Sequence, residues 1–223
     1  MEIVDYADRE LMAIDVANRL AGELRAALSH RERVLFAVPG GSTPGPVFDA
    51  LCAAQIGWDS VDVLLTDERW VRPDHPRSNT RLVRERLLVD RAAAARLLPM
   101  YQPTDTPDAA VARVTETIAP HLPISVLLLG MGEDGHIASL FPGADRLEEA
   151  LAEDAPPVMA LRAPGVDEAR LTLTRPVLDG ALSKHLAITG TAKREALERA
   201  QRRAETQAPV RAVMTGLTVH WAA

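Results

Sequence analysis

The chain has 223 residues, a formal net charge of −6 and an apolar share of 47%. The negative charge argues against a protein that binds nucleic acid regardless of sequence, because such binding depends on a basic surface. No apolar run is long enough to cross a bilayer, and the acidic first residues lack the form of a signal peptide. The single cysteine, Cys52, can form no internal disulfide. We therefore expect a cytoplasmic protein with no nucleic-acid or membrane partner.

The first half of the chain alternates between helical and strand patterns. Apolar residues recur at helical spacing over residues 8–28, which predicts a long amphipathic helix. The apolar run Val34–Val38 predicts a buried strand, after which Ser42 or Thr43 is expected to cap a helix that continues to about Ala54. The elements predicted next are a strand over residues 61–66 and helices over residues 78–88 and 109–119.

The same alternation continues in the second half. Residues 124–129 are the most strand-like run, and residues 171–174 alternate as a half-exposed strand would. A strand over residues 185–189 precedes a helix over residues 192–204. Strands that alternate with helices predict an α/β fold: a single domain over residues 1–223, with a mostly parallel, doubly wound sheet flanked by helices on both faces.

Polar or glycine-rich segments follow several of the predicted strands. In sheets of this kind, ligands bind where the carboxyl ends of the strands meet. We therefore expect these segments to converge on one site. They comprise residues 39–43, 66–69, 130–136 and 190–193.

The segment Gly40-Gly41-Ser42-Thr43 lies between a predicted strand and a predicted helix. Glycines let the backbone approach an anion, and a helix N-terminus supplies free N–H groups, so the segment suits a phosphate. A tight turn with a capping hydroxyl is the alternative interpretation. Lys193 lies in the first turn of the last predicted helix, where it either contacts the same phosphate or stays on the surface.

The triplet Asp67-Glu68-Arg69 follows the strand over residues 61–66. Adjacent opposite charges often form a solvated loop end, but the position at a strand terminus favours a place in the site. There Arg69 is suited to bind phosphate or a developing oxyanion, and Asp67 to orient a sugar hydroxyl or a positive side chain. Arg170, on the alternating strand, either lines the same cleft or faces water.

The segment from Gly130 to His136 is the most informative, with three glycines in its first six residues. Such a loop is shaped by its backbone, and it presents His136 close to Asp134. Histidine titrates near neutral pH, which suits a general base, and a carboxylate can fix its tautomer. The other histidines are dispersed without metal-ligand spacing, and the chain has no Gly-x-Ser-x-Gly elbow. We therefore predict a metal-free site centred on His136.

Taken in order, these motifs resemble those of the 6-phosphogluconolactonase family. The strongest match reads GMGEDGHIASLFPG over residues 130–143. The resemblance implies hydrolysis of 6-phospho-D-glucono-1,5-lactone to 6-phosphogluconate, the second step of the oxidative pentose phosphate pathway. It also implies a monomer that needs no metal and no organic cofactor. The other matching segments are Gly40–Pro44, Asp67–Val71 with Ser78-Asn79, residues 170–174 and residues 190–193.

On this reading His136 activates the attacking water, and Asp134 or Asp67 orients the histidine or the water. Arg69 stabilises the oxyanion or binds phosphate. The remaining substrate-binding residues are expected to be Gly40, Gly41, Ser42, Thr43, Arg170 and Lys193.

Two other readings stay open. Aminosugar-phosphate isomerases and deaminases share the fold and the Asp-Gly-His motif. They usually continue into Phe-Asn-Glu-Pro, whereas this chain has Ala-Ser-Leu-Phe-Pro-Gly over residues 138–143. The alternatives to the lactonase are therefore a glucosamine-6-phosphate isomerase or deaminase, and a non-catalytic sugar-phosphate sensor.

Overall fold

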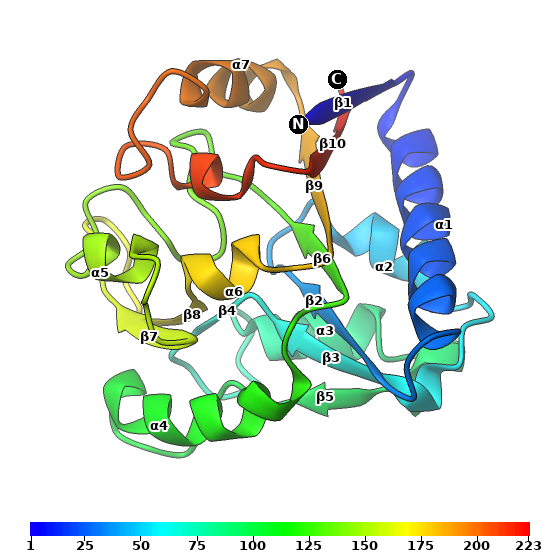
Figure 1. Ribbon diagram of the computed structural model, residues 1–223, viewed down its shortest axis with the longest axis horizontal. Coiled ribbons are helices and arrows are strands. Elements are labelled where there is room, and N and C mark those ends of the chain that lie inside the picture. Colours follow the sequence, from blue (N-terminus) through cyan, green and yellow to red (C-terminus); the bar gives the residue numbers. More distant parts are fainter.

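The computed structural model describes residues 1–223, and its largest element is a seven-stranded sheet. The strands are β1 (Glu2–Tyr6), β2 (Val34–Val38), β3 (Val61–Leu65), β5 (Arg96–Leu98), β6 (Val126–Leu129), β9 (Ser183–Thr189) and β10 (Leu217–Ala222). They lie in the order β1-β10-β9-β6-β2-β3-β5, and all neighbours are parallel. The sheet runs through the middle of the molecule in Figure 1, with both chain termini near one edge.

Helices cover both faces of this sheet. They are α1 (Arg9–Leu28), α2 (Gly45–Leu51), α3 (Asn79–Arg86), α4 (Pro107–Ile118), α5 (Leu147–Leu151), α6 (Arg175–Asp179) and α7 (Thr191–Ala200). In Figure 1, α1 lies on one side of the sheet and α4 on the other. The predicted α/β fold with a mostly parallel, helix-flanked sheet is therefore confirmed. No helix combines the length and the apolarity that crossing a membrane requires.

Two helix starts follow directly from the sequence. The Asp8 side chain accepts a hydrogen bond from the Leu11 backbone N–H at 2.7 Å and so caps α1. The Ser78 hydroxyl accepts one from the Arg81 N–H at 3.3 Å and caps α3. The helical spacing in α1 also places Val16, Leu20 and Leu24 in the core, where each is fully buried.

The predicted cap of the next helix is wrong. Neither Ser42 nor Thr43 caps α2, which begins at Gly45 after Pro44 and ends at Leu51. Pro44 already has helical dihedral angles, φ −75° and ψ −15°, and no side-chain hydrogen bond closes this end. The two hydroxyl residues therefore precede the helix in a turn and are left free for other partners.

A second, smaller sheet was not predicted. It is antiparallel and consists of β4 (Asp67–Arg69), β8 (Arg170–Leu173) and β7 (Val158–Leu161), with β8 in the centre. The strand predicted over residues 171–174 is present as β8, but the prediction that it is half-exposed is wrong, because all four residues are buried. The cause is tertiary: α4 packs against β7 and β8, and the Ser139 backbone N–H donates to the Thr172 hydroxyl at 3.1 Å.

The order of the strands fixes where a ligand can bind. From β2 the chain builds outward through β3 and β5, then returns to the other side of β2 and builds through β6, β9 and β10. The loops after β2 and β6 therefore leave neighbouring strands in opposite directions and open a crevice between them. These are the glycine-rich segments 39–43 and 130–136.

Candidate active site

A cavity of about 230 Å³ lies at the carboxyl ends of the strands. All four segments that the sequence placed at strand ends contribute to its wall. Of the predicted site residues only Asp134 is absent from the lining, and it is hydrogen-bonded to His136. The predicted residues that do line the cavity are Gly40, Gly41, Ser42, Thr43, Asp67, Arg69, His136, Arg170 and Lys193.

His136 and Asp134 form a hydrogen-bonded pair, with 2.7 Å between His136 Nδ1 and Asp134 Oδ1. Burial would raise the pKa of Asp134, but the hydrogen bond and the charge of His136 outweigh burial and hold that pKa below its usual range. The carboxylate is therefore ionised and has no proton to donate. Nδ1 must carry the hydrogen, which leaves Nε2 of a neutral His136 ring as the proton acceptor.

Close packing holds the His136 ring in place. A Cβ on Gly132 would lie 2.3 Å from two atoms of the ring and 2.6 Å from Asp134 Oδ1, so only glycine fits there. The Gly132 N–H also donates to the carbonyl of His136 at 3.0 Å. On another side, the Phe141 ring centroid lies 4.1 Å from that of His136. Gly132, one of the three glycines that marked this loop in the sequence, thus makes room for the catalytic candidate.

Asp67 has different partners from Asp134. Its Oδ2 accepts from the Ser139 hydroxyl at 2.6 Å, and its backbone carbonyl accepts from Asn79 Nδ2 at 2.9 Å. Asp67 is 7% exposed and lines the cavity. Of the two aspartates that the sequence offered as partners of the histidine, Asp134 makes the hydrogen bond and Asp67 is held by Ser139 and Asn79.

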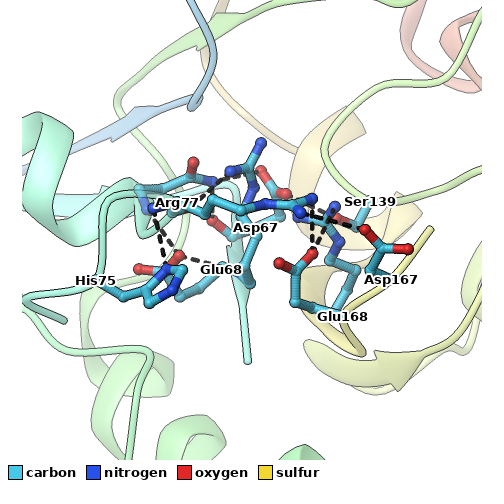
Figure 2. Close-up of polar contacts among 10 residues, drawn as sticks. Asp67, Glu68, His75, Arg77, Ser139, Asp167 and Glu168 are labelled. Atoms are coloured by element: carbon cyan, nitrogen blue, oxygen red, sulfur yellow. Dashed lines mark hydrogen bonds and ion pairs between the residues drawn. The ribbon is translucent and has the colours of Figure 1, made fainter. Parts of the chain in front are cut away.

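Two arginines bring positive charge to the cavity wall, and not all of their nitrogen atoms have hydrogen-bond partners. The Nε atoms of Arg69 and Arg170 are buried and have no partner within the chain. Burial, together with the charge of Arg69, lowers the pKa of Arg170 from its usual range. The nearest carboxylate to Arg170 is Glu168, at 3.9 Å, and Figure 2 shows that Arg77 also reaches Glu168. Such a pair of guanidiniums suits an anionic ligand.

The loop after β2 contributes glycines for two separate reasons. Gly41 has a φ of +89°, which side chains disfavour. Gly40 lies against the side chain of Asn79, where a Cβ would come within 1.9 Å of Oδ1. Lys193 also lines the cavity and is the third residue of α7, in the first turn of the helix as predicted.

Some residues of the lining were not singled out as site residues in the sequence. Asn79 and Phe141 belong to segments that the family resemblance covered, but neither of them was assigned a role in the site from the sequence. Ala138 lines the cavity with a φ of +49°, an unusual conformation for a residue with a Cβ. No pattern in one sequence reveals such a conformation. The others are Pro39, Pro44, Gly130, Met131 and Gly132.

Comparisons with known proteins identify the family of the chain. A family model described as glucosamine-6-phosphate isomerases/6-phosphogluconolactonase matches residues 7–221. A 6-phosphogluconolactonase of Rhizobium meliloti (strain 1021) is 43% identical over 220 residues, which cover 96% of this chain and 93% of the relative.

Solved structures extend the comparison to the fold. A crystal structure of a 6-phosphogluconolactonase from Shewanella baltica OS155 superposes with a TM-score of 0.96 at 31% identity, covering 100% of this chain and 98% of that one. A monomeric glucosamine-6-phosphate deaminase shares the fold, with a TM-score of 0.82 at 17% identity and coverage of 100% and 97%. The chain therefore belongs to the glucosamine-6-phosphate isomerase/6-phosphogluconolactonase family.

Proposed function

We propose that this chain hydrolyses 6-phospho-D-glucono-1,5-lactone to 6-phosphogluconate in the oxidative pentose phosphate pathway. The observation that carries the proposal is the His136–Asp134 pair beside a cavity that Arg69, Arg170 and Lys193 line. A base and a cluster of cations are what hydrolysis of an anionic ester requires. Relatives named 6-phosphogluconolactonase, 43% and 40% identical to this chain, support the same reaction.

In the proposed mechanism, Nε2 of His136 takes a proton from water, and the water oxygen attacks the lactone carbonyl carbon. Asp134 stabilises the imidazolium that forms. The tetrahedral intermediate then collapses, the bond between the carbonyl carbon and the ring oxygen breaks, and His136 returns its proton to that oxygen. General acid–base catalysis of this kind supplies a factor of roughly 10² to 10⁴. A lactone is already an activated ester, so the mechanism needs no covalent nucleophile.

The substrate carries negative charge at its phosphate and develops more at the carbonyl oxygen. We assign the 6-phosphate to the loop Gly40–Thr43 and to Lys193, which both line the cavity. Arg69 and Arg170 supply positive charge to the remaining oxygens, including the oxyanion. Binding the phosphate far from the carbonyl positions the reacting group, so that remote binding energy lowers the barrier.

We also propose that the enzyme is a cytoplasmic monomer. Cys52 is free and buried, as suits a reducing compartment. The monomer is what the resemblance to the 6-phosphogluconolactonase family implies.

The test is an assay of lactone hydrolysis on freshly prepared substrate. The release of acid measures the rate, and the spontaneous rate is subtracted. Acceleration over that rate supports the proposal. Ammonia release from glucosamine 6-phosphate would instead indicate the deaminase reaction. Binding of 6-phosphogluconate without turnover of either substrate would indicate a sensor.

A further inference from the structure

Glu68 is a fully buried carboxylate between two residues of the site, Asp67 and Arg69. Because side chains alternate along a strand, Asp67 and Arg69 line the cavity while Glu68 does not. Figure 2 shows Asp67 and Glu68 as neighbours whose polar contacts go to different partners. A buried carboxylate without hydrogen bonds is strongly unfavourable, so the partners of Glu68 reveal what it stabilises.

Four donors satisfy this carboxylate, and three of them come from the start of α3. Oε1 accepts from the backbone N–H groups of Arg69 and Asn79, both at 2.8 Å. Oε2 accepts from the Thr80 N–H at 2.8 Å and from the Ser78 hydroxyl at 3.0 Å. A negative charge on these N–H groups is also favoured by the helix dipole. Glu68 thus joins the beginning of α3 to strand β4.

This junction extends into the cavity wall. Asn79, fixed through its backbone by Glu68, uses its side-chain amide to hold the carbonyl of Asp67 at 2.9 Å. The same amide packs on Gly40, at the start of the loop proposed to bind phosphate. The backbone of Arg69 is fixed directly. One carboxylate outside the cavity therefore sets the relative positions of residues that line the cavity on strand β4 and in the loop after β2.

We propose that Glu68 is a positioning residue for the lactonase reaction. It does not touch substrate. It acts through Asn79 and the backbone of Arg69, which place Asp67, Arg69 and Gly40 around the ligand. The inference depends on the proposed function only for the choice of substrate in the assay.

The direct test is Glu68→Gln, which keeps the shape but replaces one acceptor oxygen with an amide. In one orientation that amide faces the N–H groups of Arg69 and Asn79, and in the other it faces the N–H of Thr80. A donor–donor conflict therefore arises in both. We expect kcat/KM per folded molecule to fall by about 10²-fold, the effect of a displacement of about 1 Å in a catalytic site. Calorimetry should also show weaker binding of 6-phosphogluconate, a readout that needs no turnover.

Asp62→Asn is the matched control for lost stability. Asp62 is a buried carboxylate at the other end of the large sheet, where it pairs with Arg33 and Arg96. This variant should lose stability but keep kcat/KM and product affinity per folded molecule. The proposal is overturned if folded Glu68→Gln retains wild-type kcat/KM and product affinity, or if Asp62→Asn loses as much of either.

Asn79→Ala provides the second variant, which leaves Glu68 and its backbone donors in place. It should reproduce most of the loss in kcat/KM and in product affinity. The fold-loss in the Glu68→Gln/Asn79→Ala double variant should be smaller than the product of the two single fold-losses, because Glu68 acts through Asn79. Should Glu68→Gln fail to fold, wild-type kcat/KM and product affinity in Asn79→Ala overturn the proposal. If the wild type shows no turnover, the proposed reaction is wrong, and the product-binding comparison still decides the role of Glu68.

Discussion

Asp134 holds His136 by two hydrogen bonds to the same oxygen. Oδ1 accepts from the ring Nδ1 at 2.7 Å and from the His136 backbone N–H at 3.1 Å. The carboxylate therefore ties the orientation of the imidazole to the backbone of the loop that carries it. Since the carboxylate accepts a hydrogen bond from Nδ1–H, it also selects the tautomer in which Nε2 is free to take a proton.

Asp134→Asn tests the role of this carboxylate. The variant keeps the shape of the side chain but loses the charge that stabilises the imidazolium. We expect kcat to fall roughly tenfold to a hundredfold. This is only part of the rate acceleration that general acid–base catalysis supplies, because His136 itself remains. KM should change little, because Asp134 does not line the cavity. Steady-state kinetics measure both values, and a wild-type kcat would remove Asp134 from the mechanism.

Gly132→Ala tests the packing behind the same pair. The new methyl group would lie 2.3 Å from the His136 ring, so the ring or the loop has to move. We expect kcat to fall by about 10²-fold, with a circular dichroism spectrum like that of the wild type. Gly22→Ala, in α1, adds the same methyl group where nothing lies within 4 Å and should leave kcat unchanged. Equal kcat values for both variants would show that the ring tolerates displacement.

Lys193→Ala tests the assignment of the phosphate. A hydrogen bond between charged groups contributes about 1.5–3 kcal/mol, so KM should rise roughly tenfold to a hundredfold while kcat changes less. Arg199 lies on the same helix, is exposed and pairs with Glu195. Arg199→Ala should keep the wild-type KM. An unchanged KM in Lys193→Ala would place the phosphate elsewhere in the cavity.

His220 makes stability depend on pH. It is fully buried between Tyr6 and His185, with its Nδ1 2.9 Å from the Tyr6 hydroxyl and its Nε2 3.0 Å from His185 Nδ1. Burial first, then the charges of His185 and Arg19, lower the pKa of His220 from 6.5 to about 4. Below pH 6.5 the unfolded chain therefore binds more protons than the folded chain. The contribution of His220 to stability is fully present above pH 6.5 and is lost as pH falls towards 4.

That loss should amount to roughly 3 kcal/mol of unfolding free energy. Urea unfolding at a series of pH values measures it. His220→Gln removes the titrating group and should flatten the dependence between pH 6.5 and 4, whereas His30→Gln, at an exposed position, should leave it unchanged. If the unfolding free energy of His220→Gln depends on pH as steeply as that of the wild type, groups other than His220 cause the loss of stability.

The site was more predictable from the sequence than the smaller sheet. Strands β2 and β6, which precede the two glycine-rich site loops, are continuous apolar runs. This pattern is local, and the convergence of the four segments then followed from a general property of parallel sheets. Strand β4, by contrast, consists of Asp67, Glu68 and Arg69, whose charges do not indicate a strand. It forms because β8 pairs with it and because Glu68 finds its donors on α3. The role of Asn79 depends on the same long-range contacts.

The measurement that tests the central claim most directly is the rate of lactone hydrolysis by His136→Ala, with folding checked by circular dichroism. If His136 is the base that activates water, kcat should fall by about 10² to 10⁴. The affinity for 6-phosphogluconate should stay near that of the wild type, because the phosphate contacts remain. A folded His136→Ala variant that hydrolyses the lactone at the wild-type enzymatic rate would contradict the account.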